Sequence, residues 1–327
     1  MNRPSTIITI AKKEITDASR NSLFLTLAFF LLALTGISIL VASFAFQSQV
    51  DQYHAALAQL SAAQLHSIVL TQPAYHPLQM LRGTIEYLEI IGAVIALVLG
   101  YLAIAKEKGS NTSRLLLTRP VTKRELMGGK LLGAGIMLGA LVLGIGLFAV
   151  VAVSGIGHVG FAASELVKLA LVLLYTFGYL LFFFCFSGAL ALFISDLPRA
   201  LMLAFSLWLV FVLIIPQIGD TMDPDNQVPG GFFAHMHMTQ NGQEAVIGQF
   251  KHYENLRNAL EVSSVEKHYE RLSFATLGIK TMYNDKSLGF IMNDKWPDLL
   301  VLLSFLGVGV ALAYAGMSNK RIMAASP

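Results

Sequence analysis

Charged residues are scarce in this sequence of 327 residues. Asp, Glu, Lys and Arg together make up 13% of the chain, and 55% of it is hydrophobic. An average soluble domain carries about 25% charged residues, so the composition excludes an ordinary soluble globule, and its apolar content also excludes a disordered chain. The net charge of +3 is small, and no basic stripe with interleaved aromatic residues marks a nucleic-acid-binding surface. The composition indicates a helical membrane protein.

Cysteine is almost absent, since Cys185 is the single one and lies in an apolar run. One cysteine forms no intrachain disulfide and provides no Cys-x-x-Cys metal or redox site. The sequence also lacks the His-Glu-x-x-His and Gly-x-Ser-x-Gly motifs of hydrolases and the nucleotide-binding motif Gly-x-x-x-x-Gly-Lys-[Ser/Thr]. We therefore expect no catalysis, no ATP hydrolysis and no cofactor in this chain itself.

Long runs without charge predict the membrane spans, because a helix needs about 20 mostly apolar residues to cross a bilayer. Six such runs occur, within residues 20–51, 89–106, 130–165, 168–196, 199–220 and 298–320. Pro216 is expected to end the fifth span early, because proline disrupts a helix interior. The predicted fold class is an all-α polytopic membrane protein with six transmembrane helices.

Cationic residues are distributed unevenly around these spans. Six Lys and Arg residues occur within residues 106–124, while residues 47–84 contain only Arg82 and residues 154–164 contain none. The positive-inside rule places the cation-rich segments, and with them both termini, in the cytoplasm. The expected location is the plasma membrane, which in bacteria is the inner membrane.

The segments outside the spans complete the predicted organisation. An N-terminal interfacial helix is expected, with an apolar face of Ile7, Ile8, Ala11 and Ile15; the alternative is a cytosolic extension of the first span. Residues 51–70 are expected to form a short external helix. The chain divides into an interfacial (elbow) helix at 1–21, spans one to five at 22–216, an external cap at 217–296, and the sixth span with a cytoplasmic tail at 297–327.

The external cap is predicted to be helical. Apolar residues recur at helical spacing from Val246 to Leu260, and Ser263 with Glu266 matches a capping box for a second helix, with Val262 as its hydrophobic staple. The segment is too long for a mere connector, so a role in gating or in contact with an extracytoplasmic partner is expected.

Two acidic residues, Glu86 and Glu89, lie three apart near the external start of the second span. One interpretation is that they line a path for a cation or substrate, and the other is that they lie at headgroup level and face water. Other charges deep within the spans are missing from the pattern, which counts against an ion-coupled carrier.

The segment between spans two and three has a distinctive pattern. An apolar ridge, Leu115–Leu117, is bracketed by arginines, Pro120 ends this short helix, and Thr122 with Glu125 forms a capping box that starts span three. Such a helix fits a groove on a cytosolic partner, with leucines as anchors. Equally, its leucines fit the headgroup layer while its cations bind anionic lipid.

Further residues distinguish this turn. They are Glu107-Lys108-Gly109, Arg114-Leu115-Leu116-Leu117, Arg119-Pro120-Val121, Arg124-Glu125 and Gly129-Lys130. This run and the six-span layout resemble the ABC-2-type transporter permease family. Within it, the sequence looks most similar to the subgroup named for the permease of nitrous-oxide-reductase copper maturation.

The resemblance implies a permease subunit of an ABC transporter, an exporter, that is not itself an enzyme. Two copies of a separate cytosolic ATPase, carrying ATP and Mg, would drive this chain and a second permease copy or sister permease, with turn 106–125 as the coupling helix. The resemblance implies ATPase contact by Glu107, Arg114, Leu116, Arg119, Pro120 and Arg124. The alternatives are a membrane scaffold or assembly factor without transport, a secondary transporter and an intramembrane enzyme.

Small residues four apart let membrane helices approach closely. They occur in span three at Gly129, Gly133, Gly135 and Gly139, and in span six at Gly307, Ala311 and Ala315. They predict either an interface with a second subunit or packing within one subunit.

The run His235-Met236-His237-Met238 is a candidate metal site in the cap. Imidazole and thioether groups together suit copper, especially Cu(I). In a strand-like segment the two histidines would share one face and the two methionines the other. The alternative is a loop beside Phe232 and Phe233 that packs on the membrane surface.

Overall fold

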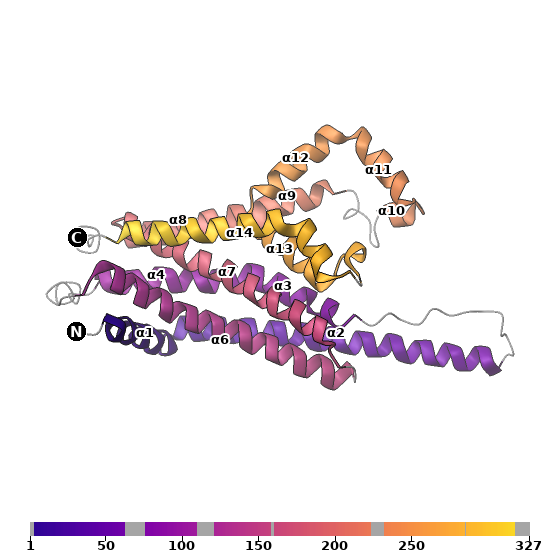
Figure 1. The fold of residues 1–327 in the computed structure, drawn as a ribbon, viewed down its shortest axis with the longest axis horizontal. Helices are drawn as coiled ribbons and strands as arrows, with labels where there is room; N and C mark the ends of the chain where they lie inside the picture. Colours follow the sequence, from indigo (N-terminus) through magenta and orange to yellow (C-terminus); the bar gives the residue numbers. More distant parts are fainter. Residues whose placement is uncertain are drawn as a thin grey trace.

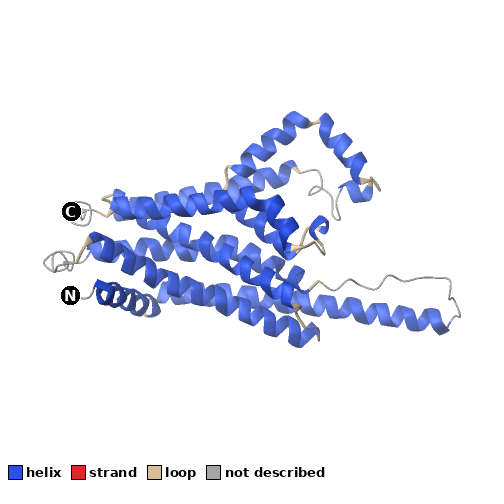
Figure 2. Cartoon of the chain, in the orientation of Figure 1, coloured by secondary structure: helices blue, strands red, loops and turns tan. Residues whose placement is uncertain are grey.

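The computed structural model describes residues 3–62, 76–109, 121–157, 160–223, 232–284 and 286–317. These residues are largely helical and contain no strand (Figure 2). Among them, six helices are long and apolar enough to cross a membrane: Ser22–Gln59, Pro77–Lys108, Lys123–Ile156, Ala163–Phe193, Leu197–Met222 and Leu288–Gly316. The predicted fold class is therefore confirmed.

The spans lie side by side in one elongated bundle (Figure 1). At one end are α1 (Arg3–Ser19), the end of α4 (Ala93–Gly109) and the start of α6 (Lys123–Gly157), which we call the turn end. The opposite end carries α9 (Ile215–Met222) and α10 to α13, which we call the cap end. The last turns of α14 (Leu288–Gly316) return to the turn end.

The central helix of the bundle is α7 (Ala163–Phe193), which contacts α4, α6, α8, α13 and α14. Its approach to α4 is the tightest: a Cβ atom added to Gly100 would lie 2.1 Å from the backbone oxygen of Phe184. Gly188 of α7 faces Gly100 in return, with 3.4 Å from its own added Cβ to the Gly100 oxygen. Small residues thus bring two membrane helices into backbone contact.

The four glycines predicted in span three all face helices of the same chain. An added Cβ at Gly129 would lie 2.5 Å from Cβ of Ile10, and one at Gly133 would lie 2.9 Å from Cβ of Glu14, both in α1. Added Cβ atoms at Gly135 and Gly139 would each lie 3.7 Å from the ring of Phe177 in α7. The first pair therefore seats the N-terminal helix, and the second pair lies against α7.

In α14 the small residues that pack inward are not Gly307, Ala311 and Ala315, which the four-residue spacing had indicated. Gly309 and Gly316 face α7, where an added Cβ would meet Phe182 at 3.2 Å and Leu192 at 3.0 Å. Gly307, by contrast, has no atom within 4 Å of an added Cβ. The stripe that begins at Gly307 thus lies on the outer surface of this chain, because α14 is rotated to present its other small residues to α7.

The N-terminal helix is present as α1 and lies along α6. Its Ala11, Glu14 and Ala18 are buried, with Glu14 directed toward a buried lysine of α6, whereas Ile8 is 49% exposed. Contact of the expected apolar face with the membrane interface stays a prediction.

The first span is longer than predicted. Helix α2 runs without interruption from Ser22 to Ala62, and its 41 residues give a length of about 60 Å at 1.5 Å per residue. The expected separate helix at 51–70 is therefore wrong in part, since residues up to 62 continue the span and residues 63–75 lie outside the described part. Figure 1 shows α2 extending past the rest of the bundle at the cap end.

Pro216 does not end the fifth span, contrary to the prediction. The span consists of α8 (Leu197–Trp208), the π-helical segment η3 (Leu209–Ile214) and α9, which continues to Met222. Proline is tolerated in the first turn of a helix, and the wider π-helical turn just before Pro216 changes the local hydrogen-bonding pattern. The local sequence alone did not reveal this arrangement.

The predicted helical cap is present between spans five and six. It contains α10 (Phe232–His235), α11 (Gln240–Gln249), α12 (Lys251–Val262), α13 (Val265–Leu277) and the short η5 (Thr281–Tyr283). Helices α11 and α12 arch away from the bundle, while α13 packs on α7 and α14 (Figure 1). The sixth span begins earlier than expected, because α14 starts at Leu288.

The predicted capping box in the cap is displaced by one residue. Ser264, not Ser263, is the N-cap of α13 and accepts a hydrogen bond from the backbone N–H of Lys267 at 3.5 Å. Its hydroxyl also donates to the backbone oxygen of Phe211 in span five. Val262 is 44% exposed and is not a buried staple.

Candidate functional site

A buried ionic cluster lies at the turn end of the bundle. Lys130 of α6 is 1% exposed, and its Nζ donates to Oε1 of Glu14 at 2.7 Å, to the backbone oxygen of Ala103 at 2.7 Å and to Oε1 of Glu107 at 3.2 Å. Lys13 of α1 donates to the same oxygen of Glu107 at 2.8 Å. The cluster joins α1, α4 and α6.

The cluster is electrically balanced, with two lysines and two glutamates. Burial alone would lower the pKa of Lys13, but its hydrogen bond and attraction to Glu107 raise that pKa overall. Such a buried pair stabilises only while both partners are present, because removing one leaves an uncompensated charge in a low-dielectric interior. The three helices are therefore held together by charges that each depend on the others.

Both ends of the segment between α4 and α6 are braced. Lys108, which is 3% exposed, donates through Nζ to the backbone oxygen of Ile194 at 2.9 Å, just after the end of α7. At the other end the predicted capping box is confirmed: the N–H of Thr122 donates to Oε2 of Glu125 at 2.8 Å, and the N–H of Glu125 donates to Oγ1 of Thr122 at 3.2 Å. The first end of the turn is thus fixed to the end of α7, and the second end is the capped start of α6.

Two of the six predicted ATPase-contact residues lie in the described part. The carboxylate of Glu107 is buried in the ionic cluster, whereas Arg124 is exposed on the first turn of α6. The remaining four, Arg114, Leu116, Arg119 and Pro120, lie outside the described residues. Sequence reasoning did not single out the bond between Glu14 and Lys130, because the partners are 116 residues apart.

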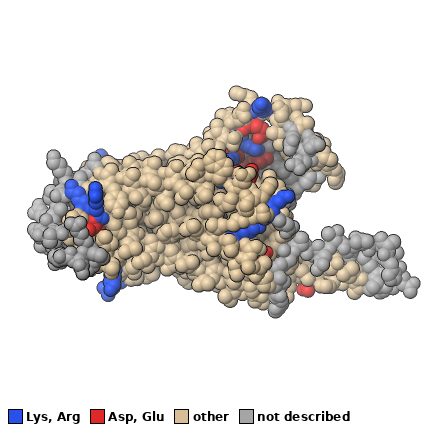
Figure 3. Space-filling model, viewed as in Figure 1, with Lys and Arg blue, Asp and Glu red and all other residues tan. Residues whose placement is uncertain are grey.

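The second candidate site is a cavity of about 1120 Å³ at the cap end. It is bordered by span two, span five, α12 and α13. Charged side chains of both signs lie in the hollow beneath the cap, while the flank of the bundle is almost free of charged side chains (Figure 3). Its charged lining consists of Arg82, Glu86, Glu89, Asp220, Asp223, Arg257, Glu261, Glu266, Lys267, Glu270, Arg271, Lys280 and Lys295.

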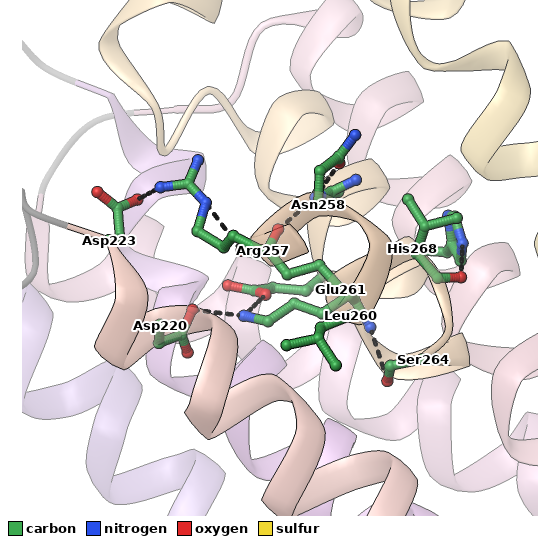
Figure 4. A network of polar contacts seen from close by, with 12 residues as sticks. Asp220, Asp223, Arg257, Asn258, Leu260, Glu261, Ser264 and His268 are labelled. Carbon is green, nitrogen blue, oxygen red and sulfur yellow. Dashed lines mark hydrogen bonds and ion pairs between the residues drawn. The ribbon is translucent and has the colours of Figure 1, made fainter. Parts of the chain in front are cut away.

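Many of these charges form ion pairs within the wall (Figure 4). Arg257 of α12 lies 3.2 Å from Asp223 and 3.6 Å from Glu261, and Glu261 also pairs with Arg271 of α13. Lys267 pairs with Asp220 at 2.8 Å and with Glu270 at 2.6 Å. At the rim, Arg82 pairs with Glu86 at 3.0 Å. These pairs attach α12 and α13 to span five.

Glu89 is an exception among the cavity carboxylates. It lies in the π-helical segment η2 (Leu88–Gly92) of span two, and its side chain forms no ion pair within 4.0 Å in the described part of the chain. Only 5% of the residue is exposed, and its buried Oε1 has no hydrogen-bond partner there. Glu89 therefore does not face water, contrary to the second interpretation, whereas the side chain of Glu86 is 47% exposed.

Glu266 of α13 is the second exception. It is 5% exposed, and the described residues offer it only the hydroxyl of Ser264 at 3.5 Å. Burial raises the pKa of Glu266 to about 8, with a further increase from the charge of Glu270 that the nearby Lys267 opposes. Glu266 and Glu89 both line the cavity.

Contacts among α7, α13 and α14 hold the backbone next to the cavity residue Glu89. Tyr179 of α7 donates its hydroxyl to the backbone oxygen of Glu89 at 2.9 Å and stacks on Tyr269 of α13, with ring centroids 4.5 Å apart. His268 of α13 contacts Asp298 of α14 through Nδ1 at 2.7 Å. Sequence reasoning also missed these anchors, since no local pattern connects α7, α13 and α14.

Charged residues lie buried within the spans, contrary to the sequence pattern that counted against an ion-coupled carrier. Glu89, Glu107, Lys130 and Asp298 are each less than 9% exposed.

The predicted copper segment does not form a strand. His235 ends the short helix α10, Met236 and His237 form a turn, and His237 has a φ of 51°. The two-face arrangement assumed for His235, Met236, His237 and Met238 is thus wrong, and the described residues contain no group of three or more His, Cys, Asp or Glu side chains that could hold a metal ion. Copper binding by this segment stays a prediction.

These features define a polytopic membrane protein with a braced turn at one end of its bundle and a charged cavity at the other. Residues 8–321 of the sequence match the family of ABC-2 family transporter proteins. The match spans nearly the whole chain, and the chain therefore belongs to this family of membrane transport subunits. A comparison with individual curated proteins gives no match.

Proposed function

We propose that this chain is the permease subunit of an ABC exporter, with its turn end in the cytoplasm of a bacterium and its cap end outside. A separate cytosolic ATPase, present in two copies with ATP and Mg, docks on turn 106–125. A second copy of the chain or a sister permease completes the transport unit. The observation that carries this proposal is the bracing of the turn by Lys130, Glu107, Lys108 and the Thr122–Glu125 capping box.

A docking segment transmits force only if its ends cannot move independently of the spans. Here one end is joined to α1 and α6 through Glu107, and the other end is the capped start of α6. A lipid-contacting turn has no need of a buried ionic base, which costs desolvation free energy. The bracing therefore supports contact with a partner that pushes.

The cap supports a contact on the opposite side. Phe250, Tyr253 and Leu256 are exposed on α12 and its start, at 61%, 44% and 52%. Exposed apolar side chains grouped in this way are typical of interaction surfaces. The proposed occupant of this surface is an extracytoplasmic partner of the transporter. We also propose that the chain belongs to the subgroup named for the nitrous-oxide-reductase maturation permease.

The test is purification of the full-length chain from its native membrane with the ATPase that accompanies it. Leu116→Asp places a charge on the apolar ridge of the turn and should release the ATPase, while the chain still elutes as a monodisperse membrane protein. Leu256→Asp makes the same change on the exposed arch of the cap and should leave ATPase binding unchanged.

Retention of the ATPase and of transport by Leu116→Asp would refute docking on the turn. If no ATPase accompanies the wild-type chain, the scaffold or secondary-transporter alternative would replace the proposal.

A further inference from the structure

We propose that Glu89 and Glu266 bind the ammonium group of an amine ligand in the cavity beneath the cap. Binding itself does not depend on the ATPase, whereas the identification of this amine with the exported molecule rests on the function proposed above.

The first step of the argument is charge pairing in the cavity wall. Every other carboxylate that lines the cavity has a cationic nitrogen within 4.0 Å, namely Glu86, Asp220, Asp223, Glu261 and Glu270. Glu89 and Glu266 have no such nitrogen in the described part of the chain. The nearest cationic residue in sequence, Lys267, already pairs with two carboxylates.

The second step is burial. A buried carboxylate without a partner is costly, because it loses hydration that nothing replaces. Among the described residues, Oε1 of Glu89 has no hydrogen-bond partner, and Glu266 has one long contact to a hydroxyl. In the unliganded cavity protons reduce this cost, as the raised pKa of Glu266 shows. A ligand cation would replace those protons.

The third step is the class of cation. A metal ion such as Ca²⁺ takes six to eight oxygen ligands, whereas two carboxyl groups supply four oxygens at most. The described residues also contain no group of three or more His, Cys, Asp or Glu side chains that could hold a metal ion. An ammonium group has three hydrogen-bond donors and suits two carboxylates with one neutral acceptor. The apolar side chains of Ile90, Val212 and Phe274 line the same cavity and suit the hydrocarbon part of an amine.

Lys280 also lines the cavity, but it is exposed, so water satisfies its charge. The carboxylate pair is therefore the part of the cavity that lacks a counter-charge, and it selects for a cation rather than an anion.

The test uses the full-length chain in lipid nanodiscs without ATPase. The probes are n-butylammonium in the buffer and hexadecylammonium in the lipid. The first tests whether the amine enters the cavity from water, and the second tests whether it enters from the membrane. Butyrate and n-butanol are the anionic and neutral controls, and binding is measured by calorimetry for the soluble probes and by thermal stabilisation for all. At least one ammonium probe should bind, and neither control should.

Glu89→Gln and Glu266→Gln should each weaken binding of that probe by about tenfold or more, as expected for loss of a charge-assisted hydrogen bond. Asp51→Asn removes a carboxylate from the exposed extension of α2 and should leave the affinity within about twofold. The unfolding midpoint of each unliganded variant checks that it folds.

Binding of butyrate equal to that of butylammonium, or an unchanged affinity in folded Glu89→Gln, would overturn the proposal. Displacement of the ammonium probe by Ca²⁺ at lower concentration than by a second amine would overturn it in favour of a metal. Because these binding experiments contain no ATPase, a negative result in them does not bear on the proposed permease function. In the same way, a failure to find ATPase docking on the turn does not bear on the amine site.

Discussion

Replacement of Lys130 by Met tests the ionic cluster at the turn end most directly. Methionine keeps an unbranched apolar side chain of similar length, so the main change is the loss of one charge and of three hydrogen bonds, to Glu14, Ala103 and Glu107. Glu107 keeps Lys13 as a partner, but Glu14 is left as a buried carboxylate that has lost its ion pair.

The expected loss is large because the lysine is almost fully buried. Breaking a buried ion pair by removing one partner costs about 3–5 kcal/mol. Lys13→Met is the matched control: it removes a lysine bonded to the same Glu107 oxygen, but the Lys13 side chain is 49% exposed. An exposed ion pair contributes about 0–1 kcal/mol, so the two variants should differ by at least about 2 kcal/mol.

The assay is equilibrium unfolding of the purified chain in mixed detergent micelles, with added dodecyl sulfate and with the fluorescence of Trp208 and Trp296 as the signal. Equal destabilisation by Lys130→Met and Lys13→Met would refute the reasoning. A second variant, Glu14→Gln combined with Lys130→Met, removes the stranded charge and should recover part of the loss. If it is no more stable than Lys130→Met alone, the cost does not come from a buried charge.

Two further predictions concern the cap end and the bundle core. Gly100→Ala should destabilise the chain by about 2 kcal/mol or more, because the new Cβ meets the backbone oxygen of Phe184, which cannot rotate away. Gly307→Ala should cost nothing in the same dodecyl sulfate unfolding assay. The pKa of Glu266 is raised to about 8 from 4.5, first by burial and then by Glu270, so the native chain binds more protons than the unfolded chain between these values. Stability should therefore fall as pH rises from about 5 to 8, and Glu266→Gln should flatten that slope; an unchanged slope would contradict the assignment.

The number of spans was predictable from the sequence because its signals are local. A run of about 20 apolar residues bounded by charges identifies a span without knowledge of its neighbours. The capping box of Thr122 and Glu125 was predictable for the same reason, since both partners lie within one turn of helix. Pro216 misled because the π-helical segment before it follows from packing that a local pattern does not record.

The candidate sites depend on contacts that cross the chain, and the sequence reveals them only in part. The cavity residue Glu266 had an apparent local role as the partner of Ser263 in a capping box. A shift of one residue in the helix start gives the N-cap to Ser264, and the Glu266 carboxylate lies 3.5 Å from the hydroxyl of that residue. Glu89 was noticed as an acidic residue near a span end, but its burial depends on α13, which follows much later in the chain.

The two candidate sites are connected by span two. Glu107 in the ionic cluster and Glu89 in the cavity lie on this span, which is helical throughout, and 18 residues of helix place them about 27 Å apart along its axis. Close contact at Gly100 packs this helix against the backbone of α7, and Tyr179 of α7 donates a hydrogen bond to the backbone of Glu89. We therefore expect the two helices to move as a pair and a displacement of the turn to reach Glu89. Helix α13 also belongs to the cap, so a change in its packing on this pair would alter the position of Glu266 relative to Glu89. The proposed amine site would then change shape when the turn moves.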